Sequence, residues 1–273
     1  MDKYLIPFFG EIPFGCFNSS LFEEFMGWSK QQKYRGKSVR NESIKKYLTL
    51  LKTICQDATV RYDWIGKYDP FFRFKMPKGE RRAYEKIFPF MPKEQDMIFI
   101  NLPEHWEPYF QFAFASGISQ GEQRAFKPEY IDWSNKKIFI RSAITLNKNG
   151  KIVEGPCKNQ YRRRTIKLSP KMFNALKKQQ KIYEKFNGRY FFCNESGSLI
   201  DPSNLRVNVW IPTLQKAELS YRAMIQTRHS FATYHLSKGA NPLKLAKIMG
   251  HSNGEMVLTV YGKYTDDGTA IED

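Results

Sequence analysis

The 273-residue chain has few cysteines and no recognisable phosphate-binding loop, and each absence excludes a class of site. Its cysteines are widely separated and form no Cys-x-x-Cys pair; they are Cys16, Cys55, Cys157 and Cys193. Neither a zinc site nor a disulfide framework is therefore indicated. No glycine-rich phosphate loop occurs, so nothing in the sequence calls for ATP. We expect no cofactor, no bound metal and no small-molecule substrate.

Long apolar runs are also missing. No stretch reaches the length of a transmembrane helix, and the short apolar segment at residues 1–9 is followed closely by Glu11. We therefore expect no membrane partner and a cytoplasmic location. The chain is nevertheless 41% hydrophobic and 15% aromatic, which is enough to build real cores.

Acidic residues are scarce relative to basic ones. Lys and Arg together number 44 against 27 for Asp and Glu, which gives a formal net charge of +17. Such an excess favours a polyanionic partner. Without a membrane signal, that partner is predicted to be nucleic acid.

The C-terminal stretch from residue 224 to residue 264 contains three consecutive helix signals. Asn241 followed by Pro242 predicts a helix N-cap with proline at the first helical position, and Gly250 is a natural stop. Residues 252–255 fit a capping box, which predicts another helix that carries Tyr261 on its third turn. Apolar and aromatic positions within 227–236 predict a helix before both.

These helices are expected to bring three reactive side chains to one pocket. Arg228 lies on the first helix, His251 in the tight link between the other two, and Tyr261 on the last. A guanidinium binds a phosphate bidentately, an imidazole donates to another phosphate oxygen, and a phenol can act as a nucleophile. The combination predicts phosphoryl transfer through a phosphotyrosine.

The order of the motifs is T-R-H-S-F-A-T, then M-G-H, then a tyrosine ten residues after that histidine. This order resembles the C-terminal motif set of the tyrosine recombinases, the phage integrase family. The resemblance implies that Tyr261 attacks the scissile phosphodiester, leaving a 3′-phosphotyrosyl link and a free 5′ hydroxyl without a cofactor. It also implies that Arg228 and His251 bind that phosphate. Lys158 matches the family's hairpin lysine, which is expected on a hairpin tip or edge and protonates the leaving 5′ oxygen.

Two of these assignments have a nearby alternative. Lys151 is a second candidate for the hairpin lysine, and Tyr264 is a second candidate for the nucleophile. His229 and His235 are interpreted as structural, because a histidine on a helix is more often a packed side chain than a reactive one.

The sequence departs from the family pattern at two positions. Residues 116–122 align with the family's T-G-[LM]-R-x-[SG]-E, which puts Ser119 where the first catalytic arginine belongs. Arg124 lies five residues further on and is expected to face another side of its helix. The family's first His position is occupied by Ile225, which cannot carry a proton. Alternative interpretations are therefore a catalytically impaired DNA-binding relative and an engineered Arg-to-Ser variant; a topoisomerase with the same mechanism is less expected in so short a chain.

The preceding sequence predicts two domains with a boundary near residue 87. Helical spacing of apolar residues predicts helices at about 20–28 and 43–55, separated by a basic loop. The resemblance makes residues 1–87 a helical core-binding domain and 88–273 the catalytic domain. Candidate phosphate contacts are the basic residues of that loop and of a later strand: Lys33, Arg35, Lys37, Arg40, Arg162 and Arg163.

Within the second domain, strands are predicted at 130–133, 137–141, 151–153 and 162–168, with helices on either side. The predicted fold class is therefore mainly α with a small antiparallel β-sheet. The resemblance implies a two-domain, C-shaped clamp around double-stranded DNA that assembles with further copies of itself into a tetramer. Members of the family often carry a further arm-binding domain upstream. We expect none in this sequence, which is therefore interpreted as either a fragment or a simpler member of the family.

Overall fold

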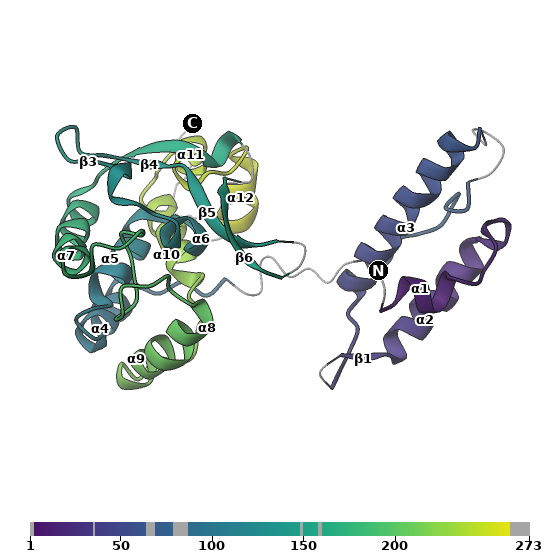
Figure 1. Cartoon of the computed structure of the whole chain (residues 1–273), viewed down its shortest axis with the longest axis horizontal. Coiled ribbons are helices and arrows are strands. Elements are labelled where there is room, and N and C mark those ends of the chain that lie inside the picture. Colours follow the sequence, from purple (N-terminus) through teal and green to yellow (C-terminus); the bar gives the residue numbers. More distant parts are fainter. Residues whose placement is uncertain are drawn as a thin grey trace, which may run out of the picture. The chain divides into compact units, whose positions relative to one another are not determined.

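The computed structural model describes residues 3–34, 36–63, 69–78, 87–147, 150–157 and 160–262. It divides into two compact units, Met1–Arg82 and Ala83–Asp273 (Figure 1). The boundary that the sequence predicted near residue 87 lies a few residues after this division.

The first unit is built on two helices. Its elements are α1 (Leu5–Phe9), η1 (Phe14–Cys16), α2 (Ser19–Gln31), β1 (Lys33–Tyr34), β2 (Lys37–Ser38) and α3 (Asn41–Arg61). Both predicted helices are present, and α3 is longer than expected at each end. The predicted loop between them is wrong in one detail, because β1 and β2 pair as an antiparallel ribbon.

Aromatic side chains hold this unit together. Phe22 of α2 is fully buried and stacks on Phe71 with ring centroids 4.1 Å apart. Phe9 of α1 packs on Phe25 of α2 at 4.9 Å. The N-terminal residues therefore belong to the core of this unit through a short helix, although their proline and glycine content is typical of irregular structure.

The second unit is mainly helical. Its helices are α4 (Pro92–Asn101), α5 (Glu107–Ser116), α6 (Gln120–Arg124), η2 (Pro128–Tyr130), η3 (Gln160–Arg162), α7 (Pro170–Phe186), α8 (Pro202–Leu205), the π-helical turn η4 (Arg206–Trp210), α9 (Ile211–Lys216), α10 (Gln226–Ser237), α11 (Pro242–Met249) and α12 (Glu255–Tyr261). Its largest core surrounds α5, where Phe110 stacks on the fully buried Trp210 at 4.7 Å.

The strands form two small antiparallel groups. β3 (Ile131–Asp132), β4 (Lys137–Ile140) and β7 (Arg164–Lys167) make a three-stranded sheet in the order β3-β4-β7. β5 (Ser142–Leu146) and β6 (Ile152–Pro156) make a separate hairpin, and β5 was not predicted. The predicted fold class, mainly α with a small antiparallel sheet, is confirmed.

A smaller core fixes the C-terminal helices to one another. Phe231 of α10, Leu245 and Met249 of α11, and Tyr261 of α12 are all buried in it. A hydrogen bond attaches this group to the start of the unit: the backbone N–H of Phe90 donates to the side-chain Oγ of Ser230 in α10 at 2.7 Å. The helices that carry the predicted reactive residues therefore form one packed group.

The predicted start and stop signals of α11 are confirmed, but the predicted start signal of α12 is not. Asn241 Oδ1 accepts from the backbone N–H groups of the first turn at 2.9 and 3.1 Å, and Gly250 ends the helix with a φ of +76°. The predicted capping box at 252–255 is wrong: Gly254 is the N-cap, and no side chain caps it. Because α12 has seven residues, Tyr261 lies at its end, on the second turn.

Among the residues that the structure describes, no helix combines the length and the apolar character needed to cross a membrane.

The two helix starts give a matched stability test. Asn241→Ala should lower the free energy of unfolding by about 1 kcal/mol, because two backbone donors lose their side-chain acceptor. Ser252→Ala should leave it within a few tenths of a kcal/mol, because no side chain caps α12. Urea unfolding followed by tryptophan fluorescence measures both. Equal losses in the two variants would show that Ser252 does cap α12.

Candidate active site

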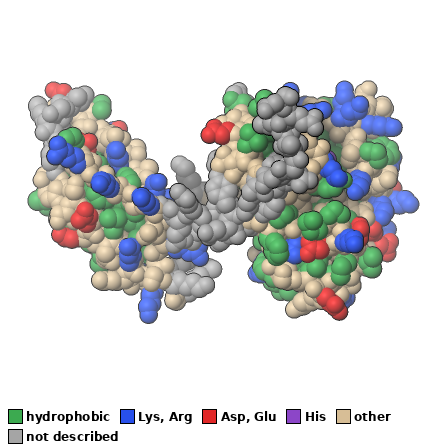
Figure 2. Space-filling model, turned by 180° about the vertical axis from the view of Figure 1, so that it is seen from behind, with side chains coloured by type: hydrophobic (Ala, Val, Ile, Leu, Met, Phe, Trp, Pro, Cys, Tyr) green, Lys and Arg blue, Asp and Glu red, His purple; other side chains and the backbone are tan. Residues whose placement is uncertain are grey.

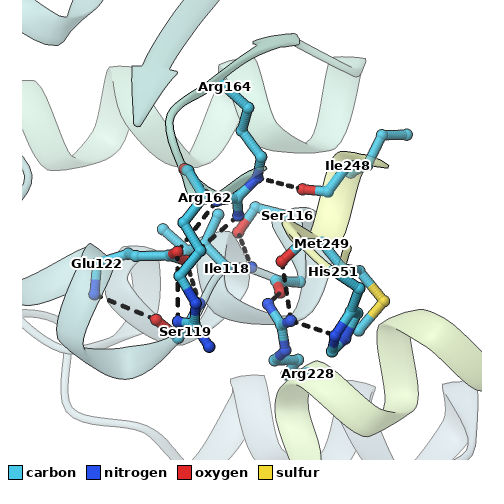
Figure 3. A network of polar contacts seen from close by, with 11 residues as sticks. Ser116, Ile118, Ser119, Glu122, Arg162, Arg164, Arg228, Ile248, Met249 and His251 are labelled. Atoms are coloured by element: carbon cyan, nitrogen blue, oxygen red, sulfur yellow. Dashed lines mark hydrogen bonds and ion pairs between the residues drawn. The ribbon is translucent and has the colours of Figure 1, made fainter. Parts of the chain in front are cut away.

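Arg228 is the centre of a polar cluster in the second unit (Figure 3). It lies on the first turn of α10 with 7% of its surface exposed. Nη1 donates to the carbonyl of Gly117 at 2.6 Å, and Nη2 donates to the carbonyl of Met249 at 2.8 Å. Burial lowers its pKa to about 10, so the guanidinium stays charged at neutral pH.

The carbonyl that holds Arg228 depends on a glycine. Gly117 follows α5 with a φ of +61°, a region that favours glycine. A Cβ atom there would lie 2.2 Å from the ring of Phe231. The first residue after α5 is therefore fixed as glycine by both conformation and space.

His251 directly contacts this arginine. Its Nε2 lies 3.0 Å from Arg228 Nη2, and its backbone N–H donates to the carbonyl of Ala246 in α11. Burial and the neighbouring charge of Arg228 lower its pKa to about 4. The imidazole is therefore neutral at pH 7, and Nε2 accepts from the guanidinium. Nδ1 consequently carries the proton.

Tyr261 has a different partner. Its hydroxyl lies 2.7 Å from Nδ1 of His229, and the side chain is 3% exposed. Burial raises the pKa of Tyr261 to about 12. Burial and the charge of Arg228 lower the pKa of His229 to about 4. Arg228 and His251 therefore meet directly, whereas the phenol is paired with a histidine that the sequence pattern had marked as structural.

Ser119 caps the short helix α6. Its Oγ accepts from the backbone N–H of Glu122 at 3.3 Å, and its own N–H donates to Glu122 Oε2 at 2.8 Å. This reciprocal pair is a capping box that was not predicted, although Ser119-x-x-Glu122 is its usual pattern.

Glu122 is 1% exposed and is held by two arginines. Arg164 donates from Nη1 and Nη2 to its two oxygens at 3.0 and 3.2 Å. Arg162 Nη1 lies 3.7 Å from Oε1. Burial disfavours the ionised carboxylate, but the hydrogen bonds and charge of Arg164 outweigh it and hold the pKa of Glu122 below its usual value.

Arg164 was not among the predicted site residues, although the strand period contained the signal. Arg164 and Ile166 are buried on one face of β7, whereas the residues that alternate with them are exposed. Of the two predicted DNA contacts nearby, Arg163 is exposed, and Arg162 extends toward Glu122 with a third of its side chain exposed. The predicted pair thus has two different environments.

Of the remaining predicted positions, Ile225 contacts Arg228 through the backbone, since its carbonyl accepts from the Arg228 N–H at 3.1 Å, and the others lie elsewhere or outside the described residues. Ile225 is the N-cap residue of α10 and is 45% exposed. Arg124 donates Nε to the carbonyl of Ile200 at 2.8 Å, which confirms that it faces elsewhere. The β5–β6 turn contains Lys151, while Lys158 and Tyr264 are outside the described residues. In the first unit Lys33 and Arg40 are exposed; Arg35 and the side chain of Lys37 are not described.

A basic groove of about 670 Å³ lies next to the cluster. Its lining includes Arg141, Arg163, Lys247 and His251. Lys and Arg side chains are also spread over the face of each unit that Figure 2 shows. Within the described part of the chain, no three His, Cys, Asp or Glu residues gather into a metal site. The groove is suited to a phosphate backbone.

The two low histidine pKa values predict a pH dependence. Each folded pKa, about 4, lies below the ordinary value of 6.5, so the unfolded chain binds more protons between these pH values. The free energy of unfolding should therefore fall as pH drops from about 6.5 toward about 4. NMR titration of the imidazole C–H resonances should give midpoints near 4 for His229 and His251. Midpoints near 6.5 would contradict the buried pairing with Tyr261 and Arg228.

Two curated relatives align with this chain over more than half of its length. The prophage integrase IntR of Escherichia coli (strain K12) is 26% identical over 256 residues, covering 85% of this chain and 59% of the relative. A XerC-like tyrosine recombinase of Caldanaerobacter subterraneus subsp. tengcongensis is 28% identical over 173 residues, covering 56% of this chain and 44% of the relative. The chain therefore spans about half the length of these curated relatives.

The fold is shared with solved integrases. The Tn1549 transposon integrase in complex with a circular intermediate DNA superposes with a TM-score of 0.74 at 18% identity, covering 94% of this chain and 83% of that one. A lambda integrase dimer bound to a COC′ core site gives 0.64 at 14% identity, covering 100% and 88%. The sequence profile of the phage integrase family matches residues 86–267. The chain belongs to the phage integrase family.

Proposed function

We propose that the chain cuts and rejoins double-stranded DNA at specific sites through a covalent 3′-phosphotyrosyl intermediate on Tyr261. The observation that carries the proposal is the direct contact of Arg228 with His251 at the edge of the basic groove. Tyr261 lies in the same packed group of helices, bonded to His229. A buried guanidinium, a neutral imidazole and a phenol are the groups that phosphoryl transfer to a tyrosine requires.

Each group has a defined task in this proposal. Arg228 neutralises the charge that grows on the nonbridging oxygens, and His251 donates its Nδ1 proton to one of them. The phenol oxygen of Tyr261 forms a bond to phosphorus while the bond to the 5′ oxygen breaks. Lys158 protonates that leaving oxygen. The energy of the broken ester is kept in the phosphotyrosyl bond, so rejoining is the reverse reaction and requires no cofactor.

The phenol proton also needs an acceptor. The raised pKa of Tyr261, about 12, keeps the phenol protonated at pH 7. His229 is neutral at that pH and contacts the hydroxyl at 2.7 Å, so its Nδ1 is placed to take the proton when Nε2 carries the other one. Because Tyr261 is 3% exposed, DNA binding must open this end of α12 before the oxygen reaches a phosphate.

Basic side chains elsewhere in the chain bind the phosphate backbone of the DNA in this proposal. We assign phosphate contacts to the groove residue Arg163 and to Lys33, Arg35, Lys37 and Arg40 in the first unit. The first unit then acts as a core-binding domain and the second as the catalytic domain, together clamping the duplex. Strand exchange joins two duplexes, so we propose a tetramer on DNA. A lambda integrase tetramer has been solved on a Holliday junction, which supports this assembly.

Tyr261→Phe tests the nucleophile. The variant should bind DNA nearly as well as the wild type and form no covalent adduct on a nicked suicide substrate, because it lacks only the attacking oxygen. Tyr234→Phe, on the exposed side of α10, is the matched control and should form adduct normally. An adduct that persists in Tyr261→Phe and disappears in Tyr264→Phe would move the nucleophile to residue 264.

The salt dependence of binding tests the grip. If six or more phosphates are neutralised, affinity should fall by about 10³-fold or more between about 50 and 200 mM salt. Fluorescence anisotropy with a labelled duplex measures it. An affinity that does not change with salt would contradict a DNA clamp. A steep salt dependence of affinity, without any covalent adduct from the wild-type chain, would identify a DNA-binding relative that has lost catalysis.

A further inference from the structure

The region around Ser119 contains one charge that the proposed reaction does not use. Figure 3 shows the side chain of Arg162 extending past Glu122 to the neighbourhood of Ser119, on the side that faces Arg228. Its Nη1 is 3.7 Å from Glu122 Oε1, and a third of the side chain is exposed. A partly exposed guanidinium therefore lies beside the phosphate-binding cluster.

The neighbouring arginines are already committed to the protein. Arg164 donates to both oxygens of Glu122, to the carbonyl of Ile248 and to the carbonyl of Arg162. Arg228 donates to two carbonyls and to His251, and both arginines are about 7% exposed or less. Arg228 can still turn its remaining N–H groups to a phosphate, but Arg164 is fixed as part of the support.

Ser119 cannot take an arginine's role. Its Oγ is occupied in capping α6, and a neutral hydroxyl offers one hydrogen bond where a guanidinium offers a charged pair. During attack the phosphate gains negative charge on its nonbridging oxygens, and two cations stabilise that charge better than one. A second cation near residue 119 would therefore strengthen stabilisation of the phosphate in the proposed reaction.

We propose that Arg162 is a catalytic residue that supplies this second guanidinium to the scissile phosphate, in place of an arginine at position 119. The inference rests on the proposed function of the same site. The Arg162–Glu122 contact of 3.7 Å exceeds hydrogen-bond length, and the third of the side chain that is exposed can be approached by a phosphate oxygen from the solvent side.

Arg164 holds both the backbone of Arg162 and the carboxylate of Glu122 in place. Arg164 Nη1 donates to the Arg162 carbonyl at 2.9 Å, and the same nitrogen binds Glu122 Oε1 at 3.0 Å. One buried ion pair therefore places the backbone of Arg162 and the carboxylate that its side chain faces. Burial is the main cause of the lowered pKa values of Arg228 and His251, and the charge of Arg162 acts in the same direction on both.

The first experiment measures the single-turnover rate of adduct formation on a nicked suicide substrate at saturating DNA. Arg162→Ala should lower the rate by about 10²-fold or more, the usual loss when one preorganised donor to a transition state is removed. Arg206→Ala, which removes an exposed arginine that lies outside the groove lining, should change it by less than about threefold. Equal rates in these two variants, with equal melting temperatures, would overturn the proposal.

Residue 119 gives a reciprocal test. Ser119→Arg in the wild-type chain should bring no large gain, because the cation is already supplied and a second one would crowd Arg162. In the Arg162→Ala background the same change should restore roughly tenfold or more of the lost rate. A gain of about 10²-fold in the wild-type background would show that the site lacks its cation and that Arg162 does not provide it.

A readout independent of cleavage separates this inference from the proposed function. Inorganic phosphate should shift the His251 imidazole resonance in the wild-type chain and in Arg206→Ala, and should need roughly tenfold higher concentration in Arg162→Ala, as expected for one charge-assisted hydrogen bond. If the wild-type chain forms no adduct but Arg162→Ala weakens phosphate, the cleavage proposal fails and Arg162 remains a phosphate ligand. If phosphate titrates both variants alike, Arg162 is not one.

Discussion

The buried ion pair between Glu122 and Arg164 is the interaction on which the rest of the site depends. It joins α6 to β7, and Arg164 extends the connection to α11 by donating to the carbonyl of Ile248. Separating a buried pair leaves an uncompensated charge and costs about 3–5 kcal/mol, so these three elements must keep their relative positions. Gly250 makes room for the pair, because a Cβ there would lie 2.8 Å from Arg164 Nη1.

The positions of Arg228 and His251 follow from this support. α11 ends at Met249, whose carbonyl accepts from Arg228, and His251 comes two residues later in contact with the same guanidinium. The position of α11, set by Arg164, therefore determines where Arg228 and His251 meet. Burial of this cluster strengthens each electrostatic contact and keeps His251 neutral, with a pKa of about 4. The cost of burying the charge of Arg228 is offset by carbonyls and by Glu122 nearby.

Tyr261 has its own polar partner within the same packed group of helices. Tyr261 packs in the small core of α10, α11 and α12, and its hydroxyl is paired with His229 instead of the arginine cluster. Its burial raises the pKa of the phenol to about 12, which keeps the hydroxyl protonated at pH 7. Under the proposed function, preformed phosphate ligands and a buried nucleophile would restrict attack to protein that has bound DNA.

Local signals in the sequence determined the helix ends at Asn241 and Gly250 and the alternation in β7, because each depends on neighbours within a few positions. The order of short motifs along the chain was enough to indicate the family. The tertiary structure decided which residues touch. His229 meets Tyr261 across 32 positions, and Arg164 meets Glu122 across 42. The sequence placed Ser119 where the family pattern expects an arginine but could not reveal that Arg162 lies beside it, because that proximity depends on the Arg164–Glu122 pair that joins β7 to α6. Pairings between distant segments depend on the packing of whole elements, which no local pattern records.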